Sequence, residues 1–251
     1  MNAVSSTLNQ QVAIVTGASR GIGAAVARKL AGEGFAVVIN YASSAREADA
    51  LVADLTARGA KAIIAVKANV ADAAEVRAMF ETAEQQLGKV DVIVNNAGVL
   101  KTMPLAQTDD AVYDQTFDIN VRGTFNMLRE ASTRLNDGGR IVNFSSTTLG
   151  LNLPGYAIYN ATKAAVESFT HVFAKELRGR NIRVNAVAPG PIATDLFLNG
   201  KTAEQVQTFA NMAPLQRLGE PDDIAAVVAF LASTASGWVN GQVVRANGGI
   251  A

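Results

Sequence analysis

The feature of this sequence that most limits its fold is a regular alternation of short apolar runs with longer helical segments. The apolar runs are continuous instead of alternating with polar residues, which is typical of parallel strands covered by helices on both faces. We therefore expect an α/β fold with a doubly wound Rossmann sheet of about seven parallel strands. The predicted strands are Val12–Thr16, Phe35–Asn40, Lys61–Val66, Asp91–Val94, Gly139–Ser145, Ile182–Ala188 and Gln242–Arg245.

Helical patterns fill the segments between these strands, and no Pro-rich or Ser-rich linker interrupts them. We therefore expect one domain over residues 11–251, preceded by a flexible tail at residues 1–10. Residues 189–219 are long for a structureless connection, so we interpret them as a substrate loop or lid, with a short helix near 202–211. The other predicted helices cover 24–33, 45–58, 72–87, 109–118, 120–136, 156–178 and 221–233.

Composition excludes several classes of protein. The 251 residues carry a formal net charge of zero and no basic run, so nothing indicates a nucleic-acid partner or an acidic membrane surface. The chain has no cysteine and a single histidine, His171, which excludes thiolate catalysis, disulfides and a multi-histidine metal site. The longest apolar run, Ile224–Ala232, is too short to cross a bilayer, and we expect a cytoplasmic protein.

A glycine-rich turn follows the first predicted strand and precedes the first helix. Such a turn lets a pyrophosphate approach bare backbone at a helix N-terminus, so it predicts dinucleotide binding. Gly17 to Gly21 also satisfies the Gly-x-Ser-x-Gly elbow of hydrolases. That alternative would need His171, which lies inside a helix and not on a late loop. The candidate cofactor residues of the turn are Gly17, Ser19, Arg20, Gly21, Ile22 and Gly23.

The end of the second predicted strand favours NADP over NAD. An NAD site of this kind needs a carboxylate there to hold the ribose hydroxyls. This chain has instead Asn40, Tyr41, Ser43 and Ser44, and its next acid is Glu47. Arg20 in the glycine turn can reach the same place. A cation with hydroxyl groups suits the 2′-phosphate of NADP.

Tyr159 and Lys163 lie four residues apart inside a long predicted helix, so they share one helix face. A positive charge close to a phenol lowers its pKa by about 1–3 units from about 10, toward the range of a general acid or base. Alone, this spacing occurs by chance on many helices, so its meaning depends on the rest of the chain.

Taken together, these features resemble the short-chain dehydrogenase/reductase family from Val12 to Gly249, and most closely its ketoacyl-carrier-protein-reductase-like and carbonyl reductase branch. The glycine turn resembles TGxxxGxG, and Tyr159 with Lys163 fills YxxxK. Two positions depart from the family pattern. Asn69 stands where the family often has an aspartate near the adenine, and Asn247 replaces the aspartate of the usual Asp-Gly-Gly near the C-terminus. The remaining matches are Asn96-Ala97-Gly98 in NNAG, Asn120, Ser146 thirteen residues before Tyr159, Asn69-Val70 after the third strand, and Pro189, Gly190, Ile192 and Thr194 beside the nicotinamide.

The resemblance implies an NADP(H)-dependent oxidoreductase that reduces a ketone or 3-ketoacyl group reversibly, and a homotetramer. In that reaction Tyr159 protonates the oxygen, Ser146 stabilises it, Lys163 tunes the phenol and holds the ribose, and Asn120 positions a water. Alternatives are a sugar or alcohol dehydrogenase and a non-catalytic NADP-binding protein. The expected substrate wall is apolar and comprises residues 149–157 and 192–212, with Leu151, Leu153, Leu196, Phe197, Leu198 and Met212.

Overall fold

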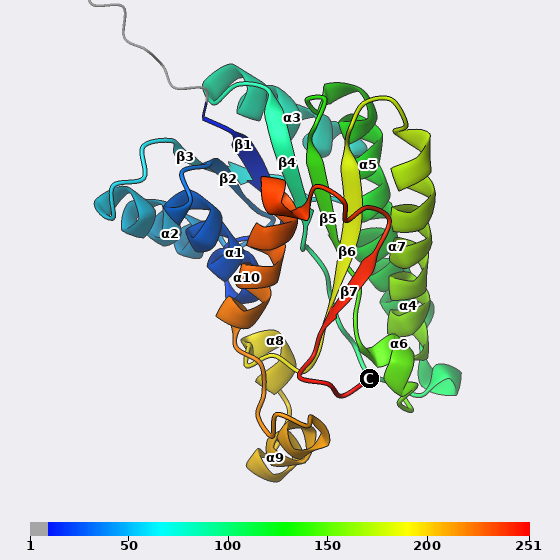
Figure 1. Cartoon of the computed structure of the whole chain (residues 1–251). Coiled ribbons are helices and arrows are strands. Elements are labelled where there is room, and N and C mark those ends of the chain that lie inside the picture. The colour runs from blue at the N-terminus through cyan, green and yellow to red at the C-terminus, as the bar shows by residue number, and fades with distance from the viewer. Residues whose placement is uncertain (1–9) are drawn as a thin grey trace, which may run out of the picture.

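The fold is built on one sheet of seven parallel strands, in the order β3-β2-β1-β4-β5-β6-β7. The computed structural model describes residues 10–251, so nearly all of the expected N-terminal tail lies outside the described residues. The strands cross the molecule side by side (Figure 1), which confirms the predicted fold class. Their bounds are β1 Val12–Val15, β2 Ala36–Tyr41, β3 Ile63–Lys67, β4 Val90–Asn95, β5 Arg140–Phe144, β6 Arg183–Pro189 and β7 Val243–Ala246.

Helices cover both faces of the sheet because its strands are apolar on both faces. One core cluster joins β1, β2 and β4 to α1, α2 and α10, and the other joins β1, β4 and β5 to α3, α5 and α7. Figure 1 shows these two helical layers on opposite sides of the strands. The helix bounds are α1 Gly21–Gly32, α2 Ala45–Ala57 and α10 Pro221–Ala232 on the first face, and α3 Ala73–Gln86, α4 Asp110–Phe117, α5 Gly123–Arg134 and α7 Ala157–Glu176 on the second.

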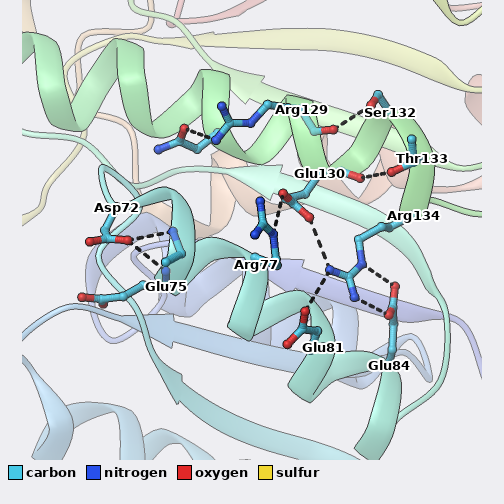
Figure 2. Close-up of polar contacts among 12 residues, drawn as sticks. Asp72, Glu75, Arg77, Glu81, Glu84, Arg129, Glu130, Ser132, Thr133 and Arg134 are labelled. Carbon is cyan, nitrogen blue, oxygen red and sulfur yellow. Dashed lines mark hydrogen bonds and ion pairs between the residues drawn. The ribbon is translucent and has the colours of Figure 1, made fainter.

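A polar contact network fixes α3 against α5 at the rim of the second layer. Arg134 donates from Nε to Glu84 Oε1 at 3.1 Å and from Nη2 to Glu84 Oε2 at 2.8 Å. Its Nη1 lies 3.3 Å from Glu130 Oε2 and 3.8 Å from Glu81 Oε1. Figure 2 shows Arg134 reaching between the two helices, with Asp72 capping the start of α3 as expected. Two parallel bonds to one carboxylate fix the relative position of the helices better than a single exposed ion pair does.

The two helices predicted at 109–118 and 120–136 form one continuous helical run. Between α4 and α5, the π-helical turn η2 (Asp118–Arg122) keeps helical backbone angles. The prediction of a break was wrong because no glycine or proline forces one, and Gly123 continues the helix with φ −59°. Gly123 is needed for another reason, since a Cβ there would lie 2.6 Å from Val70 Cγ2.

Two short helices were missed by the sequence patterns, because four residues are too few to show a helical period. They are α6 (Thr148–Leu151), directly after β5, and α8 (Asp195–Leu198), after β6. The helix expected near 202–211 is α9 (Ala203–Met212), which is capped by Thr202. Figure 1 shows α8 and α9 beyond the carboxyl ends of the strands, so residues 189–219 lie next to the edge where ligands bind in such sheets. Two 3₁₀ turns complete the chain, η1 Leu105–Gln107 and η3 Thr234–Ser236.

Strand order reverses between β1 and β4, and this switch point places the functional site. The glycine turn leaves β1 there, and Asn96 to Gly98 leave β4 beside it. Within residues 10–251, no helix combines the length and the apolar character needed to span a membrane.

Candidate functional site

Two hollows meet at the carboxyl edge of the sheet, and both include Ile22, Asn96, Gly98 and Thr194. The first, a cleft beside β5 and α7, contains about 910 Å³ of space that is partly open to solvent. The second, a longer groove beside β1 and β2, contains about 1360 Å³. We call them the cleft and the groove. Every predicted cofactor residue lines one of the two.

Most of the predicted cofactor residues line the groove, and the others line the cleft. Those of the groove are Gly17, Ser19, Arg20, Gly21, Ile22, Gly23, Asn40, Tyr41, Ser43, Ser44, Asn69, Val70, Asn96, Ala97, Gly98 and Thr194. Those found in the cleft alone are Tyr159, Lys163, Pro189, Gly190 and Ile192.

The glycine turn brings backbone unusually close to backbone. Gly17 has φ +60° and Gly21 has φ +55°, in the left-handed region that favours glycine. A Cβ on Gly17 would lie 2.9 Å from Ala97 Cα, and one on Gly23 would lie 2.6 Å from Asn96 Nδ2. No side chain caps the N-terminus of α1, and Gly21, Ile22 and Gly23 line the groove, so the helix start faces it as an anion site requires.

Two of the predicted cofactor residues hold this turn through their side chains. Asn40 Oδ1 accepts from Gly17 N–H at 3.2 Å, and Asn40 Nδ2 donates to Ala68 O at 2.9 Å. Asn96 Nδ2 donates to the carbonyls of Thr16 and Gly17, at 2.9 and 3.0 Å. These amides shape the groove, and Asn40 is too deeply buried and committed to serve as a ligand group.

The end of β2 offers a cation and hydroxyl groups to the groove. Arg20 is exposed at the N-terminus of α1, and Ser43 and Ser44 face the same space. No carboxylate from the end of β2 lines the groove; Asp195, from α8, is the only acidic residue among its lining residues. The arrangement agrees with the expected preference for a 2′-phosphate.

Two residues that line the groove also make contacts within the protein. Asn69 is exposed, but its Oδ1 already accepts from Ala71 N–H at 3.1 Å, which leaves one lone pair for a ligand. Thr194 lies over the glycine turn, with its Cγ2 3.4 Å from where a Cβ of Gly21 would be. The β6–α8 connection therefore closes the groove at its junction with the cleft.

The catalytic candidates Ser146, Tyr159 and Lys163 come together in the cleft. Ser146 follows β5, and the other two lie on successive turns of α7. The Ser146 hydroxyl lies close enough to the Tyr159 hydroxyl to influence the Tyr159 pKa. Lys163 Nζ lies 5.5 Å from the centroid of the Tyr159 ring and donates to Phe144 O at 2.8 Å.

The pKa of Tyr159 contradicts the expectation that Lys163 lowers it. Burial raises the pKa of the Tyr159 phenol to about 12. Two smaller contributions oppose each other, since Ser146 lowers this pKa and Tyr156 raises it. Burial also lowers the pKa of Lys163 to about 8. Lys163 is not among the causes of the Tyr159 shift, so desolvation determines the pKa of the phenol.

Asn120 is the one catalytic candidate that lines neither hollow. Its side chain is buried in the π-turn η2, where Oδ1 accepts from Val99 N–H at 2.8 Å and Nδ2 donates to Val99 O at 3.0 Å. Nδ2 also donates to Thr162 Oγ1, which in turn donates to the backbone carbonyl of Tyr159. Asn120 therefore ties the β4 loop to the turn of α7 that carries Tyr159.

The outer part of the cleft is apolar, as predicted, but its members differ in part. Leu151, Leu153, Leu196 and Phe197 line it, whereas Leu198 and Met212 do not and are exposed. Sequence reasoning did not single out Phe209, which packs edge-on against Phe197 with centroids 5.3 Å apart. The amphipathic period of α9 was the available signal. Tyr156, within the predicted wall, also lines the cleft, whereas Val99, Leu100 and Thr148 line it and were missed.

The hydrolase alternative finds no support in this geometry. Ser19 lies in the groove, while His171 is exposed on α7 and lines neither hollow. Among residues 10–251, no group of three or more potential metal-ligating His, Cys, Asp or Glu side chains comes together.

Comparison with known proteins agrees with the site. The profile of a family described as enoyl-(acyl carrier protein) reductase matches residues 17–251. A short-chain type dehydrogenase/reductase of Picea abies is 45% identical over 252 residues, which cover 96% of this chain and 93% of that one. The chain belongs to the short-chain dehydrogenase/reductase family.

Two further members of the short-chain dehydrogenase/reductase family bear on the chemistry. The 3-oxoacyl-acyl-carrier-protein reductase FabG of Staphylococcus aureus is 43% identical over 242 residues, covering 95% of this chain and 97% of its own. A blue fluorescent protein from a metagenomic library, solved in complex with NADPH, superposes with a TM-score of 0.90 at 40% identity and covers 96% of this chain and 98% of its own.

We expect the buried Lys163 to give the protein a pH-dependent stability. Its pKa is about 8 when folded and an ordinary 10.5 when unfolded, so between these values the unfolded chain binds more protons and stability rises with pH. The free energy of unfolding of the wild type, relative to Lys163→Met, should increase from pH 8 to pH 10.5. Urea denaturation of both proteins across this range measures it, and a constant difference would contradict the shifted pKa.

Proposed function

We propose that this protein catalyses the NADPH-dependent, reversible reduction of a ketone or 3-ketoacyl group to a secondary alcohol. The observation that carries the proposal is that Ser146 and Tyr159 line the same cleft, which shares Ile22, Asn96, Gly98 and Thr194 with the groove. A reacting carbonyl needs hydrogen-bond donors where negative charge develops on its oxygen. The hydroxyls of Ser146 and Tyr159 supply such donors in the cleft beside the groove.

The groove fits a dinucleotide with a 2′-phosphate. Gly17, Gly21 and Gly23 line the groove, and no side chain caps the start of α1 there, so backbone N–H groups can meet a pyrophosphate. Arg20, Ser43 and Ser44 would hold the phosphate of the adenosine ribose, and Pro189 to Thr194 would border the nicotinamide. NADPH, when bound, supplies the hydride. The NADPH complex of the related metagenomic protein supports this choice of cofactor.

The residues of the cleft supply the proton, the second donor to the carbonyl oxygen and the contacts to the ribose. Tyr159 donates its proton to the carbonyl oxygen, and a pKa raised by burial keeps the phenol protonated before the reaction. Ser146 is the second donor to that oxygen. Lys163, anchored on Phe144 O, retains two further ammonium protons for ribose hydroxyls. Asn120 acts through structure, because its side chain bonds Thr162 Oγ1, which donates to the backbone carbonyl of Tyr159.

The outer cleft favours an uncharged, apolar substrate. Its walls are Leu151, Leu153, Leu196, Phe197 and Phe209, and Tyr159, Tyr156 and Lys163 are the only titratable residues among the lining residues. The Staphylococcus reductase acts, by its name, on 3-oxoacyl groups, which supports a ketoacyl substrate. We propose residues 189–219 as the substrate loop. An enoyl thioester, whose carbonyl oxygen also gains negative charge when hydride adds to its double bond, is the second substrate class to test.

A panel of ketones, 3-ketoacyl thioesters, enoyl thioesters and sugars, followed by loss of NADPH absorbance, tests the function directly. Turnover of a ketone or ketoacyl substrate supports the proposal, and turnover of enoyl thioesters alone would replace it. Tight NADPH binding with no turnover would indicate the non-catalytic alternative. A cytoplasmic location stays a prediction that cell fractionation can test.

Tyr159→Phe should lose the proton donor while keeping the ring that packs in the cleft. We expect kcat to fall by roughly 10²–10⁴-fold, the usual contribution of a general acid. The Kd for NADPH should stay within about twofold, because the phenol hydroxyl is not needed for the groove. Steady-state kinetics and NADPH fluorescence titration measure the two effects, and near-normal turnover in this variant would refute the role of Tyr159.

Arg20→Ala should reduce the preference for NADPH over NADH. Loss of a hydrogen bond to a charged phosphate costs about 1.5–3 kcal/mol, so the ratio of the two kcat/KM values should fall roughly 10- to 100-fold. Arg46→Ala is the matched control, since Arg46 is an exposed arginine near the same place that does not line the groove. Equal changes in both variants would contradict the assignment.

We propose a homotetramer, because exposed aromatic side chains lie on two separate surfaces. Phe125 on α5 is 45% exposed, and Trp238, between α10 and β7, is fully exposed. Two self-complementary surfaces per chain are what a closed four-subunit assembly needs. Light scattering should give about four times 26.2 kDa, and Phe125→Glu or Trp238→Glu should each reduce the assembly to a dimer. A wild-type monomer would contradict this.

A further inference from the structure

A chain of side-chain hydrogen bonds lies directly behind Ser146. Thr148, the first residue of α6, has its Oγ1 2.9 Å from Ser146 Oγ and 2.7 Å from Asn160 Oδ1 on α7. The backbone N–H of Thr148 also donates to Ser146 Oγ at 3.2 Å. Neither Thr148 nor Asn160 was a candidate site residue in the sequence.

The orientation of Asn160 sets the direction of this chain. Its Nδ2 lies 3.0 Å from Thr148 O, and because a carbonyl only accepts, the amide nitrogen must face it. The amide oxygen therefore faces Thr148 Oγ1. An amide oxygen cannot donate, so the hydroxyl proton of Thr148 is directed at Asn160.

This arrangement makes the Ser146 hydroxyl the hydrogen-bond donor to the Thr148 hydroxyl. The Thr148 hydroxyl has a single proton, which Asn160 already receives, so Ser146 must be the donor across the 2.9 Å contact. The Ser146 proton then points away from Tyr159. What Ser146 presents toward the Tyr159 hydroxyl is a lone pair, and the hydrogen bonds run one way from Ser146 through Thr148 to Asn160.

We propose that Thr148 and Asn160 are positioning residues that hold the proton of Ser146 away from the Tyr159 oxygen in the unliganded protein. The one-way chain favours the protonated phenol, which is the form that a reductase must have ready. A substrate carbonyl can draw the Ser146 proton toward itself during the reaction. Only this effect on turnover rests on the proposed function, because the proton arrangement follows from the contacts alone.

Few other titratable groups lie close enough to Tyr159 to change its pKa. The titratable residues of the cleft around Tyr159 are Tyr156, whose ring centroid is 6.4 Å away, and Lys163. A Ser146 hydroxyl that donates to the Tyr159 oxygen lowers the Tyr159 pKa and opposes the effect of burial. Freeing the Ser146 proton should therefore lower that pKa, whereas a purely structural role for Thr148 should not.

Thr148→Val keeps the shape of the side chain and removes the acceptor, and Asn160→Leu removes the acceptor of Thr148. Both should lower the Tyr159 pKa by about one unit, the effect of one hydrogen bond to the phenolate. Thr148→Ser, which retains the hydroxyl, should restore the wild-type value. Thr147→Val is the matched control, because the Thr147 hydroxyl bonds Ala188 O and Asn247 and not Ser146.

Ultraviolet absorbance of the phenolate, recorded just after a rapid jump to alkaline pH, measures the pKa without any substrate. Subtracting the same titration in a Tyr159→Phe background isolates Tyr159 from the other tyrosines. In the oxidation of an alcohol, which needs the phenolate, the rise of kcat/KM with pH should move to lower pH by the same amount.

An unchanged or raised Tyr159 pKa in both Thr148→Val and Asn160→Leu would overturn the inference, and so would an equal shift in Thr147→Val. A lowered pKa in a protein that reduces no carbonyl would support the inference while the proposed function failed. Carbonyl reduction by the wild type, with no change of the Tyr159 pKa in the two variants, would support the proposed function and overturn the inference. The two proposals can therefore fail separately.

Discussion

The structure depends on how the backbone of the glycine turn is satisfied where β1 and β4 diverge. A turn in this position buries N–H and C=O groups that no strand or helix pairs, and buried backbone groups need partners. The amides of Asn40 and Asn96 supply them, one from each side of the turn. Because these bonds join β2, β1 and β4, they fix the groove and the position of α1 together.

Polar contacts of the same kind hold α7 on the sheet. Asn143 on β5 donates to Thr170 Oγ1 at 2.9 Å, and Lys163 donates to the end of the same strand. Asn120 connects the next part of α7 to the loop after β4. Such bonds have a required direction and length, so they define the rotation of the helix more closely than apolar packing does. Tyr159 therefore faces the cleft from a rigid support.

The sequence predicted the fold and most of the site because both depend on local patterns. Continuous apolar runs indicated the seven strands, and the glycine turn, Ser146 and the Tyr159–Lys163 pair occupy the expected edge of the sheet. Properties that depend on distant neighbours were not predictable. The pKa of Tyr159 follows from burial by several segments, and the roles of Thr148 and Asn160 depend on two distances between α6 and α7. Likewise, an asparagine in a motif does not reveal whether its amide faces a ligand or the backbone, as Asn40 and Asn120 illustrate.

The π-turn η2 has a consequence for how this chain can change during evolution. Asp118 to Arg122 accommodate one residue more than an α-helix would in the same rise, which keeps both α4 and α5 facing their neighbours. Each residue of an α-helix turns the face by about 100°. Deleting one residue here would make the helix regular and keep α4 and α5 in place, but it would move Asn120 away from Val99. Inserting a residue that lengthens the α-helix would instead rotate α5 away from α3. The segment should therefore tolerate substitutions at its exposed positions, yet reject every change in its length.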